Sequence, residues 1–457
     1  MILLHNATIV TASNEGIGSI LIDGDTIRKV FWQDPDGMTE LEGRIMPFGE
    51  LSDSLNDVEC IDLTGKHIMA GGIDAHVHFR EPGLAHKADM ETESRAAVAG
   101  GVTTVFDMPN TNPPTITPEA MAGKIAIGKE KSVAKIGFHI GASNSNSDMI
   151  CNLVRNGDET TGIKANDIPG VKVFMGSSTG NMLVDDSSSL DRLFDIREKP
   201  VLVHCEDEAI IRANLKAATE KYGEDIPFEE HENIRSRQAC IRSSIKALEL
   251  AMKHGTRLVL CHISTKEELN MVRAAKDINP EIIAETSSNY LWFSNEDYSR
   301  LGSKVKCNPS VKTADDRQAL RDGLRDGLID TIGSDHAPHL LSEKEAPYTK
   351  APSGLPSIQQ SLPVLLTVAR KEDIPLTRIA SVFSEKASAL YRLDRGRIAS
   401  GMKADLVIFD YAKEYTVKAE DQFSKCGWTP YEGETLNGYI ETVYIDGHKI
   451  FDNGLFI

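Results

Sequence analysis

The stretch that decides the fold is Gly71-Gly72-Ile73-Asp74-Ala75-His76-Val77-His78-Phe79-Arg80-Glu81-Pro82-Gly83. Its apolar first half leads into two histidines one residue apart, and a Pro-Gly pair ends the segment. Residues i and i+2 of an extended strand point to the same face, so both imidazoles can bind one metal ion. Such pairs also arise by chance on surface strands, so the interpretation depends on the rest of the chain.

The middle of the chain repeats the pattern of this stretch. Apolar, β-prone runs occur at 73–79, 102–108, 136–142, 171–175, 201–204, 258–263, 282–286 and 329–335. Segments of helical composition, such as 90–99 and 242–253, lie between several of them. Strands rich in Val and Ile that alternate with helices indicate βα units and a buried parallel sheet. We therefore predict an α/β fold whose residues 71–395 form a (β/α)8 TIM-like barrel.

The two ends of the chain lack the alternation of strands and helices that is predicted for the middle. Short β-prone runs with turn residues fill 1–70, and similar runs return at 404–410 and 441–447. We expect 1–70 and 396–457 to form one small β-sandwich domain together. Within it, the polar stretch 34–57 is expected to be an irregular surface excursion.

The composition excludes several classes of protein. The chain has 457 residues, 26% of them charged, and a net charge of −18, which argues against a nucleic-acid binder. No apolar stretch approaches the roughly 20 residues that span a bilayer, and no signal peptide is visible. The seven cysteines include no CxxC pair, which is typical of reduced thiols in a cytoplasmic protein. We expect a cytoplasmic protein with no nucleic-acid or membrane partner.

Polar side chains stand where several predicted strands end. In a TIM-like barrel, functional groups lie at the carboxyl ends of the strands. The candidates at these ends are His76, His78, Lys172, His204, His262 and Asp335.

Each candidate alone also has an ordinary structural explanation. His204 or His262 could be a core histidine with one hydrogen bond, and Lys172 could extend to solvent. Together, however, these groups would be costly at a barrel mouth unless something neutralised and coordinated them. A metal centre does both, and histidine with oxygen ligands suits Zn2+. A lysine carbamylated by CO2 would offer two oxygens that bridge two ions.

This set of residues resembles the cyclic amidohydrolases of the amidohydrolase superfamily, a group that includes dihydroorotases, allantoinases and dihydropyrimidinases. Three motifs are similar to the dihydroorotase family: His78-Phe79-Arg80-Glu81-Pro82-Gly83, Asp107-Met108-Pro109-Asn110-Thr111 and Ser334-Asp335-His336-Ala337-Pro338-His339. The resemblance covers nearly the whole chain. The stretches after Asn308 and around Leu355–Gln360 depart from the family pattern. The resemblance therefore supports the metal site more strongly than the substrate pocket.

The resemblance implies a role for each candidate. His76, His78 and Asp335 would bind one zinc and His204 with His262 the other, bridged by carbamylated Lys172. The substrate-binding set would be His78, Arg80, Asn110, Asn308, His339, Ser353 and Gly354, with Arg80, Asn110 and His339 on the substrate carboxylate. Asp335 would be the catalytic residue, accepting a proton from the attacking water and delivering it to the leaving ring nitrogen.

The implied activity is the reversible closure of N-carbamoyl-L-aspartate to L-dihydroorotate in pyrimidine synthesis. Arg80 discriminates among the relatives, because allantoin and dihydropyrimidines lack the carboxylate that a guanidinium recognises. An allantoinase, a dihydropyrimidinase or hydantoinase, and a non-catalytic scaffold are the alternatives. For Arg80 itself, the alternative is a surface ion pair with Glu81. The sequence leaves a homo-oligomer open.

Overall fold

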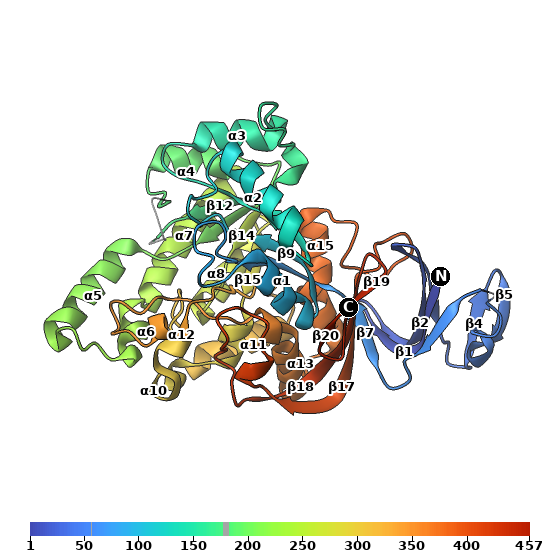
Figure 1. Ribbon diagram of the computed structural model, residues 1–457. Coiled ribbons are helices and arrows are strands. Elements are labelled where there is room, and N and C mark those ends of the chain that lie inside the picture. Colours follow the sequence, from blue (N-terminus) through green and yellow to red (C-terminus); the bar gives the residue numbers. More distant parts are fainter. Residues whose placement is uncertain (56, 177–181) are drawn as a thin grey trace.

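The computed structural model describes residues 1–55, 57–176 and 182–457. A barrel of parallel strands ringed by helices adjoins a large mixed sheet, from which one hairpin projects (Figure 1). The strands of the barrel are β8 Gly72–Val77, β9 Val102–Asp107, β10 Lys135–Phe138, β11 Ile140–Gly141, β12 Val171–Phe174, β13 Val201–His204, β14 Leu258–Leu260, β15 Ile283–Thr286 and β16 Thr331–Ile332.

Each predicted barrel strand is present, and each pairs in parallel with its neighbours. The third predicted strand is divided at His139, so that β10 pairs with β9 and β11 pairs with β12. The barrel closes by a single parallel bridge between Val77 and His336, beside a hydrogen bond of 2.8 Å from the His78 N–H to the His336 carbonyl. This seam joins the first strand to the segment that follows the last one.

Helices follow most of these strands and cover the barrel. They are α1 Met90–Ala99, α2 Pro118–Lys131, α3 Ser147–Asn156, α4 Ser187–Phe194, α5 Glu208–Tyr222, α6 His231–Ile234, α7 Arg237–His254, α8 Lys266–Lys276, α9 Ser288–Trp292, α10 Tyr298–Leu301, α11 Ala314–Arg325, α12 Leu341–Lys344, α13 Ser361–Glu372, α14 Leu376–Ala380 and α15 Lys386–Tyr391. The Asp89 side chain caps α1 by accepting from the Thr92 N–H, and Thr265 with Glu268 forms a capping box on α8.

Both parts of the chain outside the barrel contribute to one nine-stranded sheet. Its strands are β1 Ile2–Val10, β2 Glu15–Asp23, β3 Thr26–Trp32, β6 Glu59–Asp62, β7 His67–Ala70, β17 Leu406–Thr416, β18 Thr435–Ile445, β19 His448–Asp452 and β20 Leu455–Phe456. Strand β17 pairs with β7, which joins the two parts. The precise boundaries, 1–70 with 396–457 against 71–395, stay a prediction.

Alternation along β17 explains why the sheet is buried on two sides. Leu406 and Ile408 pack with Ile9 and Ile20 in the interior of the small domain, whereas Val407 and Phe409 belong to the core shared with the barrel. The Asn437 N–H of β18 donates to Thr367 of α13 at 2.8 Å. The small domain is therefore packed firmly against the barrel.

The stretch 34–57 is more ordered than we predicted. Strands β4 Met38–Leu41 and β5 Arg44–Pro47 form the projecting hairpin, visible beyond the sheet in Figure 1. Phe48 and Leu51 then turn inward and pack on Leu3 and Phe31. These two apolar side chains are the signal that separates the segment from a solvated loop.

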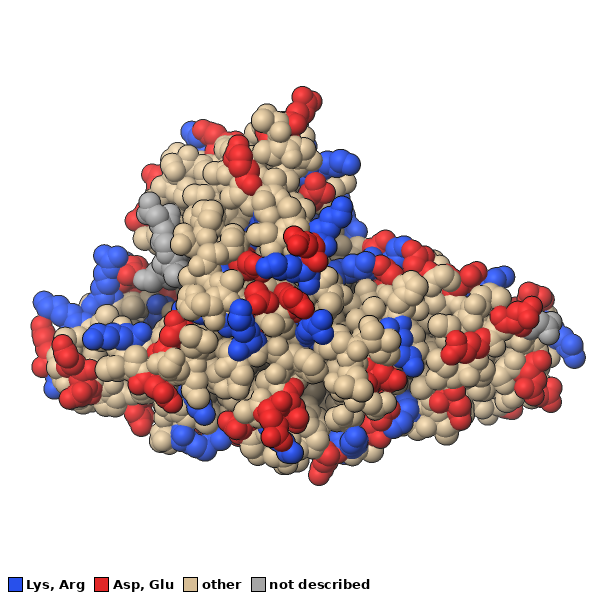
Figure 2. Space-filling view, viewed as in Figure 1, with Lys and Arg blue, Asp and Glu red and all other residues tan. Residues whose placement is uncertain are grey.

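The surface carries its charge in a mixed pattern. On the face shown in Figure 2, acidic and basic side chains are interspersed over the barrel and the sheet. Within the described residues, the helices include none that is both long and apolar enough to cross a membrane.

Candidate metal centre and substrate pocket

A cavity of about 440 Å³ opens at the carboxyl ends of the barrel strands. All the residues predicted for the site line it: His76, His78, Arg80, Asn110, Lys172, His204, His262, Asn308, Asp335, His339, Ser353 and Gly354. The cavity therefore brings together groups that lie as far apart in the chain as His76 and Gly354.

The first cluster consists of His76, His78 and Asp335. The Oδ1 atom of Asp335 lies 3.1 Å from Nε2 of His78 and 3.6 Å from Nε2 of His76. The three ligand atoms are all within 4.8 Å of one another, a spacing that could hold one metal ion. The cluster spans the seam of the barrel, because His76 lies in β8 and His78 directly follows it, whereas Asp335 follows the last strand, β16.

The second cluster consists of His204 and His262, with Lys172 close by. Nδ1 of His204 lies 2.9 Å from Nε2 of His262, so both ring nitrogens face one point. The rings of His262 and His76 are 5.2 Å apart between centroids, which places the two clusters side by side. Lys172 is fully buried, with Nζ 3.3 Å from Sγ of Cys261, and therefore does not extend to solvent.

Hydrogen bonds orient the imidazoles of the first cluster as metal ligands. Nδ1 of His76 donates to Glu285 at 2.8 Å, and Nδ1 of His78 donates to Oδ1 of Asn110 at 2.7 Å. Each donation leaves the Nε2 lone pair of that ring pointing toward Asp335. A carboxylate behind a ligating histidine is a common feature of metal sites.

The protonation states also fit a metal. Burial, with a further effect from Lys172, lowers the pKa of His76 well below its usual value, and burial does the same for His262. Neutral imidazoles and an ionised carboxylate are the forms that bind a divalent cation.

Arg80 also lines the cavity and is almost fully buried. Its Nε donates to the Pro338 carbonyl at 3.1 Å, and its Nη2 lies 2.9 Å from Nε2 of His339. The alternative of an ion pair between Arg80 and Glu81 is wrong. Glu81 instead binds Lys131 at 2.5 Å and accepts from the Met90 N–H.

The neighbours of His339 determine its tautomer. Lys87 Nζ lies 3.1 Å from Nδ1, and an ammonium can only donate, so Nδ1 accepts. Nε2 therefore carries the proton and donates to the Ser353 carbonyl at 3.2 Å. Burial and the charges of Arg80 and Lys87 lower the pKa of His339, which keeps the ring neutral. The Arg80 Nη2 group then faces another N–H and has a donor to offer to an anion.

The loop that carries Ser353 and Gly354 is held from beneath by buried lysines. Lys344 Nζ donates to the Pro352 and Gly354 carbonyls at 2.9 and 3.1 Å, and Lys306 Nζ donates to the Ala351 carbonyl at 2.6 Å. The Gly354 N–H donates to the Lys306 carbonyl. The backbone of this loop is therefore fixed in place before a substrate binds.

Several residues of the site escaped the sequence reasoning. Glu285 and Glu206 hold His76 and His204, at 2.8 and 3.0 Å. Glu206 follows His204 by two residues, a spacing that could have indicated it. Lys87 and Arg235 also line the cavity, but they lie on long connections rather than at strand ends.

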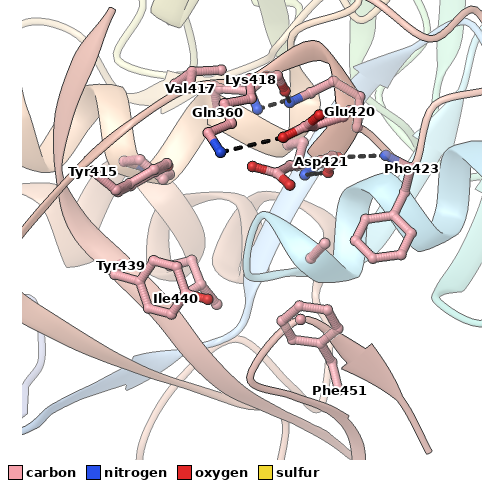
Figure 3. Close-up of a pocket in the computed structure, with 15 residues that line it drawn as sticks. Gln360, Tyr415, Val417, Lys418, Glu420, Asp421, Phe423, Tyr439, Ile440 and Phe451 are labelled. Carbon is pink, nitrogen blue, oxygen red and sulfur yellow. Dashed lines mark hydrogen bonds and ion pairs between the residues drawn. The ribbon is translucent and has the colours of Figure 1, made fainter.

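A second cavity, of about 350 Å³, lies away from these residues. It is bounded by α13, the segment 417–423 and the aromatic rings of Tyr415, Tyr439 and Phe451 (Figure 3). Gln360 closes one side through a hydrogen bond of 2.9 Å to Gln422. None of the predicted site residues borders it.

Comparisons with known proteins agree with this geometry. The profile of the Amidohydrolase family matches residues 67–450. A dihydroorotase of Methanosarcina acetivorans is 35% identical over 385 residues, covering 82% of this chain and 79% of that protein. A dihydroorotase of Staphylococcus epidermidis is 30% identical and covers 99% of both chains.

The solved structures agree on the fold. The L-hydantoinase (dihydropyrimidinase) from Arthrobacter aurescens superposes with a TM-score of 0.88 at 25% identity, over 100% of this chain and 97% of its own. A dihydropyrimidinase from Brevibacillus agri gives a TM-score of 0.86 at 26% identity, covering 100% of this chain and 96% of its own. The predicted fold class, a TIM-like barrel with a small β-sandwich, is confirmed. The chain belongs to the amidohydrolase family and, within it, to the dihydroorotases.

Proposed function

We propose that this protein interconverts N-carbamoyl-L-aspartate and L-dihydroorotate at the cavity described above, with two zinc ions held by carbamylated Lys172 and the neighbouring ligands. The observation that carries the proposal is the buried guanidinium of Arg80 in the same cavity as the histidine clusters. A buried cation with a free donor favours a substrate that carries a carboxylate.

The metal ligands in this proposal are those of the two clusters. His76, His78 and Asp335 would hold one zinc, and His204 with His262 the other. Carbamylation would convert Lys172 from a cation that repels metal into an anionic ligand between the two ions. When bound, the zinc ions would polarise the ring carbonyl and acidify the attacking water.

The residues of the chain would divide the remaining work. Arg80, Asn110 and His339 would hold the substrate carboxylate. Lys87 keeps the proton of His339 on Nε2, and this N–H would turn from the Ser353 carbonyl to the carboxylate when the substrate binds. The carboxylate of Asp335 would take a proton from the attacking water and pass it to the leaving ring nitrogen. Asn308 would lie beside the ring, where its buried Oδ1 has no hydrogen-bond partner among the described residues.

The likeness to hydantoinase structures does not change the proposal. Those structures are 25–26% identical to this chain, whereas the dihydroorotases cited above reach 30–35%. The likeness shows the fold that both groups share, whereas the choice of substrate in this protein would be set by the groups around Arg80. A cytoplasmic location and a homo-oligomer stay predictions.

A direct comparison of substrates tests the proposal. Ring opening of L-dihydroorotate, allantoin and dihydrouracil is measured on one preparation whose zinc content is determined at the same time. We expect turnover of dihydroorotate alone, with about two zinc ions per chain. Comparable turnover of the two rings without a carboxylate would contradict the role of Arg80, and a metal-loaded protein inactive on all three would favour a scaffold.

A further inference from the structure

A second arginine lines the cavity on the side of the second histidine cluster. Arg235 follows helix α6 in the long connection between β13 and α7, and its side chain is 12% exposed. Arg80, in contrast, lies against His339 and the Pro338 carbonyl. The cavity therefore has two guanidinium groups in two different surroundings.

Arg235 is linked to the candidate metal centre through one carboxylate. Its Nη1 pairs with Oε2 of Glu206, and that same oxygen lies 3.0 Å from Nε2 of His204. Glu206 is fully buried, so it holds the arginine and the imidazole in a fixed relation. The guanidinium of Arg235 is thus connected to His204, a proposed zinc ligand, through the single side chain of Glu206.

The backbone of Arg235 is fixed as well. Its carbonyl accepts from Oγ of Ser310 at 2.9 Å and from Nζ of Lys312 at 3.1 Å, and its N–H donates to the His231 carbonyl at 2.9 Å. Its Nε and Nη2, however, donate to no group in the part of the chain that the structure describes. A rigid, nearly buried guanidinium therefore keeps unused donors beside the cavity.

The proposed reaction produces an anionic group to which these donors could bind. Dihydroorotate carries one carboxylate. When water adds across the ring amide, the C–N bond breaks, the nitrogen gains a proton, and the acyl carbon becomes a second carboxylate with release of one proton. The open form therefore has one more negative charge than the ring, at the carbon that reacts beside the metal ligands.

We propose that Arg235 forms a second anion subsite, which binds the carboxylate present only in the open, dicarboxylate form of the substrate. The proposal rests on the proposed function and adds a specificity-determining residue to it. Arg80 would bind the carboxylate common to both forms, whereas Arg235 would favour N-carbamoyl-L-aspartate over the ring. The competing explanation is that Arg235 only neutralises Glu206 and so positions His204.

Rates alone cannot separate these explanations. The equilibrium constant of the reaction fixes the ratio of kcat/KM in the two directions, so any variant changes both values by the same factor. Binding of unreactive probes is the quantity that discriminates. Succinate represents the open dicarboxylate, and orotate represents a ring with one carboxylate; both are measured as competitive inhibitors of the metal-loaded enzyme.

Two variants and one control make the test decisive. Arg235→Gln should raise the Ki of succinate by roughly ten- to a hundredfold, the effect of losing a charge-assisted hydrogen bond, and change the Ki of orotate by less than about threefold. The double variant Arg235→Gln/Glu206→Gln leaves no unpaired buried charge. The double variant is assayed after reloading with zinc to the wild-type content, and we expect it to bind orotate as the wild type does while succinate binding stays weak. Arg242→Gln, at an arginine whose side chain is 74% exposed in α7, is the matched control and should change neither Ki.

Two results would overturn the subsite. An unchanged succinate Ki in Arg235→Gln would show that the guanidinium does not contact the second carboxylate. Wild-type succinate binding in the double variant would show that Arg235 acts only through Glu206. Failure of the wild-type enzyme to open dihydroorotate is a different result, because it removes the proposed function and the subsite with it.

Discussion

Residues of the site adopt a backbone conformation that side chains usually avoid. Arg80, His262 and Asp335 have φ values of 67°, 38° and 49°. A non-glycine residue in this left-handed region is uncommon, and such residues cluster at functional sites because the surrounding structure offsets their strain. Here Arg80 is held by Pro338 and Asp335 by the seam of the barrel. The cost of these conformations is consistent with selection for chemistry rather than for stability.

Substitution of Arg80 tests the carboxylate pocket. Arg80→Met keeps the length of the side chain but removes the charge-assisted donors, so we expect the KM for dihydroorotate to rise by about ten- to a hundredfold. The measurement is steady-state ring opening. Arg95→Met, on the outer side of α1, is the control and should leave KM unchanged. A KM close to that of the wild type in Arg80→Met would remove the carboxylate role.

Substitution of Lys172 tests the bridging ligand. Lys172→Ala should abolish the metal-dependent activity, because the oxygens of the carbamylated side chain are lost. Added acetate or propionate should restore part of the rate and of the zinc content by replacing that carboxylate. Propionamide has a similar size without the charge and should restore neither. Full activity of the variant without additives would be incompatible with a bridge at Lys172.

How well the sequence predicted each residue depended on its position relative to a strand. His76 and His204 were predictable because a strand fixes the direction of each side chain and the barrel fixes where strands end. Arg235 and Lys87 were not, since only the folded path of a long connection brings them to the cavity. Glu285 lies within β15, but an isolated acidic residue in a strand does not reveal that it faces His76.

At the scale of elements, the end of β16 depends on a residue without a side chain. A Cβ atom on Gly333 would lie 2.7 Å from both Cδ of Glu285 and Cβ of His76. Real Cβ atoms essentially never approach so closely, so β16 can lie beside the first cluster only with glycine there. Packing around the metal ligands is therefore as restrictive as their chemistry.

The substitution Gly333→Ala measures this restriction. We expect the free energy of unfolding to fall by roughly 1–3 kcal/mol, the usual range for overpacking, and zinc content to fall because His76 is displaced. Urea denaturation and metal analysis give the two values. Gly123→Ala in α2, where a Cβ meets nothing within 4 Å, should instead stabilise the protein by about 0.5–1 kcal/mol. Equal effects of the two substitutions would argue against the packing explanation.

The elements themselves were largely predictable, and the exceptions have physical reasons. Runs of Val and Ile located the barrel strands because a buried parallel strand is apolar on both faces. The division of the third strand at His139 could not be predicted from the sequence. It reflects a change of pairing partner, and the residue types on either side of it are equally β-prone. The hairpin β4–β5 was missed because most of its side chains are polar or exposed.

For the whole molecule, the first cluster has a structural as well as a chemical position. His76 and His78 come from one side of the seam and Asp335 from the other, where pairing is limited to a single bridge. A metal ion bound there would join the first strand of the barrel to the end of the last. We therefore expect metal to stabilise the closed barrel.

Removal of metal tests this expectation. Chelation should lower Tm by several degrees, because a ligand at a hundred times its Kd stabilises the folded state by about 2.7 kcal/mol. Amide hydrogen exchange should accelerate mainly at 72–78 and 331–336, and added zinc should reverse both changes. Uniform acceleration over the whole barrel, or none at the seam, would contradict a local role.

The sheet shared by both parts of the chain has a consequence for synthesis. Strand β7 ends at Ala70 and its partner β17 begins at Leu406, so roughly 330 residues separate them. At a translation rate of about 5–20 residues per second, β17 is synthesised on the order of 15–65 s after β7. During that interval the apolar faces of the early strands stay partly uncovered, which makes the nascent chain a natural client for chaperones on the ribosome.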